Sequence, residues 1–185
     1  MHPVHRLSRR LELRELEATD AAAVFAVYGS ETATEHLSFE PRTLDEIQQF
    51  VTRSINASKA DPRTEYALAV AERESGHIIG TGRLALDPHQ PGGATIGFAL
   101  RPASWGSGYG LETVRLLLGF GFEELGLHRI WGARSPANEA SARTMAHAGM
   151  VEEGRIREHV RKAGAWRDSI VHAILDHEWA AQDTP

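Results

Sequence analysis

Three glycines at alternate positions, Gly106, Gly108 and Gly110, mark the stretch of this sequence best suited to hold a ligand. A short apolar run, 96–100, precedes them and a long helical pattern follows. Backbone N–H groups at the start of a helix have no intrahelical partner, and the helix dipole adds partial positive charge there. Glycines let the backbone close around an anion. The stretch therefore predicts a phosphate or pyrophosphate site that needs no lysine.

Three known phosphate motifs can be compared with this turn. The Walker loop requires Gly-Lys-Ser/Thr before the helix, which is absent. The dinucleotide fingerprint G-x-G-x-x-G fails at its last position, where Leu111 stands. The acetyl-coenzyme A loop Q/R-x-x-G-x-G/A matches residues 105–110 except at its first residue, Trp105. A glycine turn without a ligand remains the alternative.

The elements that must position this turn follow from hydrophobic periodicity and turn residues. Thr43 and Glu46 form a capping box that starts one of the helices. We expect strands at 10–16, 66–71, 77–86, 94–100, 129–134, 151–161 and 169–175, helices at 19–30, 43–61, 111–125 and 138–147, and a loop at 31–42. This order contains one β-α-β crossover, which predicts a mixed α/β sheet and not a doubly wound one.

Composition excludes several classes of chemistry. The chain has 185 residues, a length typical of one domain, and it has no cysteine, so disulfides, thiolate nucleophiles and cysteine-ligated zinc are excluded. The formal net charge of −5 argues against a nucleic-acid partner. No H-E-x-x-H set accompanies the ten histidines, so we expect no metal. No segment is apolar enough for a signal peptide or a membrane span, so we expect a cytoplasmic protein without a membrane partner.

Short motifs in a shared order extend from about Arg10 to Trp179. They are W-G-x-G-Y at Trp105–Tyr109, N-x-x-S at Asn138–Ser141, G-F/M at Gly149-Met150, E-G at Glu153-Gly154, R-E at Arg157-Glu158, G-x-W-x-D at Gly164–Asp168 and E-W at Glu178-Trp179. In these motifs the sequence resembles the GCN5-related N-acetyltransferase (GNAT) superfamily, and within it the RimJ/RimL-like branch of ribosomal-protein N-terminal acetyltransferases.

This resemblance implies a single-domain α/β fold. Its mixed, mostly antiparallel sheet would have about seven strands flanked by about four helices, with the fourth and fifth strands splayed apart. The acetyltransferase domain would occupy residues 10–180, with residues 1–9 and 181–185 as tails.

The resemblance also implies cofactor and catalytic residues. The pantetheine arm of acetyl-CoA would pair with backbone groups of Phe98, Ala99 and Leu100, and the Phe98 amide would stabilise the oxyanion. The loop would bind the pyrophosphate through Trp105, Gly106, Ser107, Gly108, Tyr109 and Gly110. Asn138 would bind pantetheine, and Ser141 would protonate the departing thiolate. The alternative for Ser141 is an ordinary first-turn helix serine.

The general base is the least defined part of the expected site. Many members of the resembling family carry a glutamate before I-G-Y/F, where this chain has Thr95, which cannot act as a base near neutral pH. His172, Glu72 and Asp87 are the possible substitutes, and solvent is another. His36, Phe39 and Trp166 would line the acceptor pocket, between residues 36–41 and the turn at 161–167; packing at the sheet edge is the alternative for these side chains.

The expected function is an acetyl-CoA-dependent N-acetyltransferase in which a neutral amine attacks the thioester directly in a ternary complex. The acceptor would be a protein or peptide N-terminal α-amine. Acetylation of a small amine, such as an amino acid, polyamine or aminoglycoside, is the enzymatic alternative. The non-enzymatic alternative is a domain that binds CoA without catalysis. Either a monomer or a homodimer is compatible with the sequence.

Overall fold

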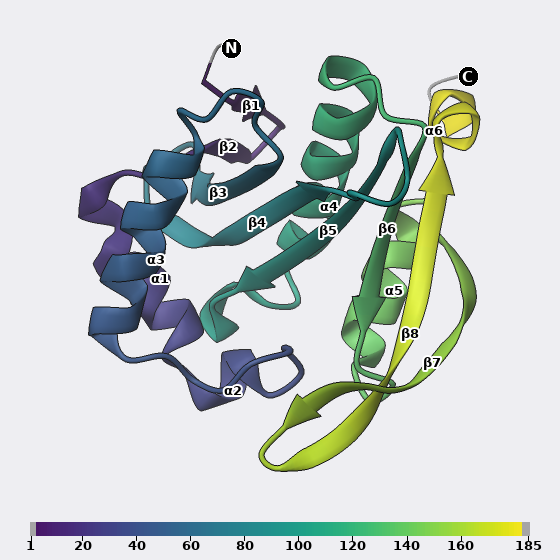
Figure 1. Ribbon diagram of the computed structural model, residues 1–185. Helices are drawn as coiled ribbons and strands as arrows, with labels where there is room; N and C mark the ends of the chain where they lie inside the picture. Colours follow the sequence, from purple (N-terminus) through teal and green to yellow (C-terminus); the bar gives the residue numbers. More distant parts are fainter. Residues whose placement is uncertain (1–2, 183–185) are drawn as a thin grey trace.

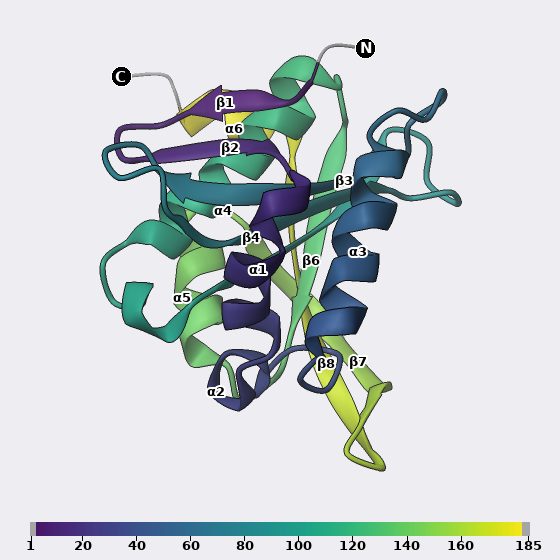
Figure 2. The ribbon, with the colours of Figure 1, turned by 90° about the vertical axis from the view of Figure 1, so that its left-hand side faces the viewer.

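The computed structural model describes residues 3–182 and shows one sheet with helices on both faces (Figures 1 and 2). The sheet has eight strands in the order β1-β2-β3-β4-β5-β6-β8-β7. The strands are β1 (His5–Leu7), β2 (Leu11–Glu15), β3 (Glu65–Glu72), β4 (Ile78–Leu86), β5 (Gly93–Leu100), β6 (Arg129–Arg134), β7 (Val151–Lys162) and β8 (Ala165–Leu175). The helices of the described residues are α1 (Ala21–Tyr28), α2 (Glu31–Thr34), α3 (Leu44–Ala57), α4 (Tyr109–Gly119), α5 (Glu139–His147) and α6 (Asp176–Gln182). The expected α/β fold class is confirmed.

Three short elements depart from the expectations. The expected N-terminal tail, residues 1–9, contains β1, which pairs with β2 and so satisfies backbone groups at the sheet edge. The expected loop at 31–42 begins with α2, because Ser30 caps it by accepting a hydrogen bond from the Ala33 N–H. The expected tail at 181–185 includes the last two residues of α6, and residues 183–185 lie outside the described part.

Helices α1 and α3 cover one face of the sheet (Figure 2). The capping box of α3 is present, since the Thr43 side chain accepts from the Glu46 N–H and the Glu46 carboxylate accepts from the Thr43 N–H. Ile47 and Val51 of α3 are buried and pack against Ala69 of β3. The predicted amphipathic face is thus the face that contacts the sheet.

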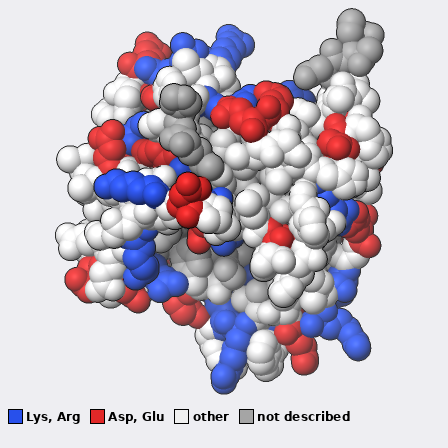
Figure 3. Space-filling model, turned by 45° about the horizontal axis from the view of Figure 1, so that its top comes forward, with Lys and Arg blue, Asp and Glu red and all other residues white. Residues whose placement is uncertain are grey.

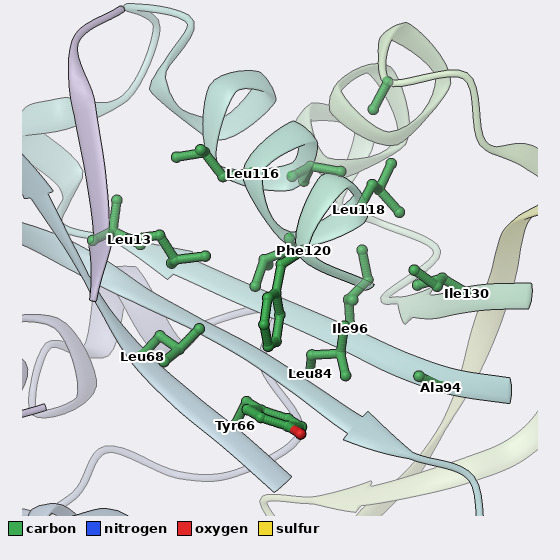
Figure 4. Close-up of a cluster of buried hydrophobic side chains, with 14 of the residues drawn as sticks. Leu13, Tyr66, Leu68, Leu84, Ala94, Ile96, Leu116, Leu118, Phe120 and Ile130 are labelled. Carbon is green, nitrogen blue, oxygen red and sulfur yellow. The ribbon is translucent and has the colours of Figure 1, made fainter. Parts of the chain in front are cut away.

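Helix α4 packs on the opposite face, over the largest hydrophobic cluster (Figure 4). Leu13, Leu68, Leu84, Ile96 and Ile130 come from five neighbouring strands and meet the apolar side of α4 and the π-helical turn that follows it. Burial of such side chains stabilises a fold by roughly 1.5–3 kcal/mol each before the loss of chain entropy is counted. The cluster holds α4 rigidly against the central strands.

Strands β5 and β6 pair over only part of their length. They form the one parallel pair among the strands of residues 3–182, and their register runs from Gly93↔Arg129 to Thr95↔Trp131. Beyond Thr95 the two strands diverge, which is visible in Figure 1 as a gap that opens toward α2. The expected splay is therefore present, and it leaves backbone groups of β5 without a strand partner.

The surface carries mixed charge. Figure 3 shows lysine and arginine side chains interspersed with aspartate and glutamate on one side of the molecule. Among residues 3–182, no helix is long and apolar enough to cross a membrane.

Candidate active site

The glycine turn has the left-handed backbone that its sequence predicts. Gly106 and Gly108 have φ angles of 74° and 80°. Gly108 is the N-cap residue of α4, and no side chain caps this helix. A Cβ built on Gly106 would meet no atom within 4 Å, so the backbone there is open to an approaching group. These properties fit a pyrophosphate, which would accept hydrogen bonds from the amides at the start of α4.

Arg10 holds this turn in place, a role that no sequence motif predicts. Its guanidinium donates to the Ser107 carbonyl through Nη1 at 2.8 Å and to Glu112 through Nε at 2.8 Å. It also lies over the Tyr109 ring, 4.4 Å from the centroid. Glu112 neutralises Arg10, and this arginine supports the turn from the position just before β2. Only the tertiary contact between residues 97 positions apart reveals that role.

The backbone of β5 faces the gap through its even-numbered residues. The Arg101 N–H donates to the Ile79 carbonyl of the β4 side at 2.8 Å, so odd-numbered residues are turned toward β4. Alternation then turns the N–H and C=O groups of Phe98 and Leu100 toward β6, beyond the end of the ladder. The Trp105 indole N–H donates a hydrogen bond to the Leu100 carbonyl oxygen at 2.9 Å. The Phe98 N–H is thus turned into the gap, where no strand partner accepts its hydrogen bond.

The N-terminus of α5 lies at the end of β6, on the other side of the gap (Figure 1). The Asn138 Oδ1 accepts from the Ser141 N–H at 2.9 Å and caps the helix. The Nδ2 group of Asn138 stays available as a donor for the expected pantetheine contact. The Ser141 hydroxyl makes no hydrogen bond with any residue of the described chain, so it is available to a ligand.

Phe98, Gly110 and Thr144 bring the three elements together. A Cβ on Gly110 would lie 3.7 Å from the Phe98 ring and 3.6 Å from Thr144 of α5. Gly110 does not have a positive φ, so it serves close packing and not a left-handed turn. The glycine turn, the free part of β5 and the start of α5 thus form one continuous site.

Thr95 lies on the face of the sheet that α1 and α3 cover elsewhere. Its hydroxyl contacts the Arg83 Nη1 at 3.5 Å, and Arg83 donates to Glu65 through Nε at 2.6 Å. Gly97, on the same face, is exposed and a Cβ there would meet nothing within 4 Å. This open face is where an acceptor can approach the gap, and no carboxylate replaces Thr95 on β5.

Glu72 and Asp87 are poorly placed to act as the base. Glu72 accepts hydrogen bonds from Tyr109 at 2.9 Å and from Ser75 at 3.0 Å, which hold the pKa of its carboxyl below the usual value. Asp87 accepts from the His89 N–H in the loop before β5, at the end where the β5–β6 ladder is intact. Glu72 lies on β3, which β4 and β5 separate from the gap, and Asp87 lies near the paired end of the gap.

His172 is buried on the other face of the sheet. Its Nε2 accepts from the Arg134 Nε at 3.1 Å, and its Nδ1 has no partner among the described residues. Burial, followed by the charge of Arg134, lowers the pKa of His172. A neutral imidazole with its Nε2 lone pair already engaged is not available to an acceptor amine.

The expected acceptor segments lie next to each other. The tip of the β7–β8 hairpin contacts residues 31–37, called the α2 segment below, through Lys162. The Lys162 Nζ donates to the Glu35 carbonyl at 2.8 Å and to the Thr34 carbonyl. Arg167 donates to the carbonyls of His36 and Leu37. Two segments more than 120 positions apart thus border the open end of the gap.

The three expected lining residues differ in their surroundings. The Phe39 ring packs edge-on against Tyr28, with centroids 5.1 Å apart. His36 is half-buried, and Trp166 is 60% exposed at the hairpin tip. Packing against Tyr28 of α1 accounts for Phe39, whereas Trp166 is accessible to a ligand.

Several motif residues prove to be structural. Asp168 accepts from the Glu158 N–H at 2.8 Å and pairs with Arg155, which supports an irregular stretch of β7. Glu178 accepts from the Leu175 N–H at 2.9 Å at the start of α6. No group of three or more His, Asp or Glu side chains within residues 3–182 could hold a metal ion.

Comparison with known proteins agrees with this geometry. The family model described as acetyltransferase (GNAT) domain matches residues 10–151. The Bacillus subtilis (strain 168) protein named uncharacterized N-acetyltransferase YnaD is 28% identical over 178 residues, which cover 95% of this chain and 99% of that protein. Two solved structures share the fold. One is a ribosomal-protein-S5-alanine acetyltransferase from Vibrio fischeri (TM-score 0.77, 23% identity, 95% and 98% of the two chains). The other is a spermidine N-acetyltransferase from Vibrio cholerae in complex with CoA and spermine (TM-score 0.81, 21% identity, 94% and 99%).

The splayed sheet, the glycine turn and the family match define the class of protein. The chain belongs to the GNAT family of acetyltransferases, which use acetyl-CoA. It is an acetyltransferase, and the proteins that share its fold include enzymes named for ribosomal-protein and for polyamine acceptors.

Proposed function

We propose that this enzyme acetylates an α-amine, that of a protein or peptide N-terminus as in the RimJ/RimL-like branch, by direct transfer from acetyl-CoA. The observation that carries the proposal is the unpaired β5 backbone at Phe98, flanked by two helix N-termini. Pyrophosphate would bind at the start of α4, and the thioester would lie beside the Phe98 amide. The groups present therefore fit acetyl-CoA.

The chain's own residues have three roles in this reaction. The Phe98 N–H donates to the carbonyl oxygen as negative charge develops on it; loss of such a donor typically costs about 3 kcal/mol of transition-state stabilisation. The Ser141 hydroxyl, which has no intramolecular partner, gives its proton to the departing thiolate. The splayed strands and the α2 segment hold the amine and the thioester in register, which supplies much of the rate in a two-substrate reaction.

Thr95 favours an α-amine over a more basic acceptor. An α-amine has a pKa of roughly 8, whereas a lysine or polyamine amine has one of roughly 10.4. At pH 7 the first is neutral in a useful fraction of molecules without a strong base, and the second is not. The absence of a carboxylate at Thr95 therefore supports a peptide N-terminus or an amino acid over a polyamine.

Thiol release from acetyl-CoA across N-terminal peptides, amino acids and polyamines tests this proposal. We expect steady turnover with α-amines and little with spermidine. A faster reaction with spermidine would replace the proposed acceptor. Binding of CoA without turnover on any amine would indicate a binding domain without catalysis.

A further inference from the structure

Arg167 is a charged side chain without a counter-charge, on the acceptor side of the site. Its Nη1 donates to the carbonyl oxygens of His36 at 3.2 Å and Leu37 at 3.3 Å. Its Nε is buried and has no partner, and its Nη2 donates to no residue within the described chain. An arginine keeps its charge in a protein, and a partly buried charge is unfavourable unless an opposite charge pairs with it.

The unpaired part of this guanidinium is one edge, in which Nε is buried and Nη2 is not. The Nε–H and one Nη2–H of arginine point the same way and match the two oxygens of a carboxylate. The bonds from Nη1 to the α2 segment leave that edge unused and fix the plane of the group.

The strand register places Arg167 on the open face of the sheet. Thr95 of β5 pairs with Trp131 of β6, and Trp131 pairs with Ala173 of β8, so these three side chains share a face. Side chains alternate along a strand, so Arg167, six positions from Ala173, lies on that face too. Thr95 and Arg167 thus border the same approach to the gap.

The guanidinium also reaches toward β5. Leu37, whose carbonyl it contacts, packs in one cluster with Ala99, the residue after Phe98. The tip of the β7–β8 hairpin and the segment around α2 lie at the open end of the gap (Figure 1). Their contact through Arg167 therefore places a cation from β8 at that end.

The charges around Arg167 do not neutralise it. Lys162 is close enough that the charge of Arg167 helps to lower its pKa, after burial, while Glu40 and Glu35 act on Lys162 in the opposite direction. Burial alone lowers the pKa of Arg167, and no carboxylate opposes that change. On the same face, Arg83 is already paired with Glu65.

We propose that the Arg167 guanidinium pairs with a carboxylate of the amine acceptor, so that the enzyme selects amines with a nearby carboxylate. This inference rests on the proposed acetyl transfer and narrows its acceptor. The carboxylate can come from an acidic first residue of a peptide N-terminus or from the α-carboxylate of a free amino acid. A polyamine would meet the positive charge of Arg167, which no carboxylate among residues 3–182 pairs with.

Matched acceptor pairs test the proposal on the unmodified enzyme. One pair is a C-terminally amidated peptide that begins with Asp against the same peptide that begins with Asn. The other pair is alanine against alaninamide. Spermidine serves as an acceptor without a carboxylate. The kcat/KM values are compared per neutral amine, because the amide group changes the amine pKa.

We expect the carboxylate member of at least one pair to react about tenfold faster or more, and the responding pair identifies the source of the carboxylate. Arg167→Gln should reduce that ratio to within about twofold, and Arg167→Lys should keep part of it. Arg53→Gln removes an exposed arginine of α3, outside the hairpin and the segment at 31–37, and it should leave the ratio unchanged. Affinity for CoA and the melting temperature report whether each variant is folded.

Each other outcome has a distinct meaning. Turnover at equal rates within both pairs overturns the inference and leaves acetyl transfer intact. A carboxylate preference that survives Arg167→Gln in a folded variant overturns the assignment to Arg167. No turnover on any acceptor, with CoA still bound, overturns both the inference and the proposed function.

Discussion

Gly108 is the residue whose backbone geometry most directly constrains the cofactor site. With φ at 80°, a β-branched side chain there is strained by more than the roughly 1–2 kcal/mol typical of the left-handed region, and it would occupy the start of α4. We expect Gly108→Val to lose CoA binding in calorimetry. Gly126 is the matched control: it has φ at 63° just beyond the π-helical turn that follows α4, and a Cβ there would meet nothing within 4 Å. If Gly126→Val lost CoA binding to the same degree, strain and not the ligand would explain the result.

Removal of the Ser141 hydroxyl tests whether this group is the general acid. The Ser141 backbone N–H, and not its side chain, completes the α5 cap, so Ser141→Ala leaves the cap intact. We expect kcat to fall about 100-fold, which is typical of a lost general acid, with little change in the Kd for acetyl-CoA. A loss of less than about threefold in single-turnover rates would make Ser141 an ordinary helix residue.

Because Thr95 stands where many relatives have a glutamate, the reaction rate should depend on the pKa of the acceptor amine. None of the three possible bases offers a free lone pair at the open end of the gap, so the acceptor must arrive neutral. We expect kcat/KM to rise with pH and level off near the amine pKa of each acceptor, roughly pH 8 for a peptide α-amine. An inflection that stays at one pH across acceptors, and disappears in His172→Gln, would show that a protein base exists.

At the scale of elements, Asn138 has two expected roles: it caps α5, and its amide group would bind pantetheine. Asn138→Ala removes the cap and should destabilise the protein by about 1 kcal/mol, measured by urea unfolding. Asn138→Ser keeps a capping oxygen and loses only the amide donor. We therefore expect the serine variant to retain stability but to bind acetyl-CoA more weakly. Equal acetyl-CoA affinity of the serine variant and the unmodified protein would restrict Asn138 to capping.

At the scale of the whole molecule, His172 makes stability depend on pH. Its pKa is lower in the folded protein than in the unfolded chain, so the unfolded chain binds more protons below about pH 6.5. Stability should be full above that pH and fall as the pH drops toward the folded pKa, by at most about 1.4 kcal/mol per pH unit. Urea unfolding between pH 8 and 5.5 measures this slope, and His172→Gln should flatten it.

Three carboxylates affect the stability of the protein in a separate, lower pH range. Hydrogen bonds and arginine partners hold the pKa values of Glu72, Glu112 and Asp168 below their usual values. Their stabilisation is present above roughly pH 4 and is lost only at lower pH, so it does not overlap the His172 window. A slope near pH 6 that is unchanged in His172→Gln would contradict the assignment to this histidine.

The sequence by itself determined the features that depend on neighbouring residues. The capping box at Thr43, the glycine turn at Gly106 and Gly108 and the start of α5 at Asn138 are local, because their geometry follows from hydrogen bonds and φ preferences within a few positions. The short elements β1 and α2 were missed, since three or four residues carry too little periodicity to predict.

Only the tertiary structure decided which groups are free to act. The Phe98 amide is unpaired because the β5–β6 ladder ends at Thr95, and His172 is occupied because Arg134 lies beside it. Arg10 and Arg167 acquire their roles from contacts between segments about 100 or more positions apart. Strand pairing, burial and charge compensation depend on residues that are distant in the sequence and close in the fold, so no local pattern could have indicated them.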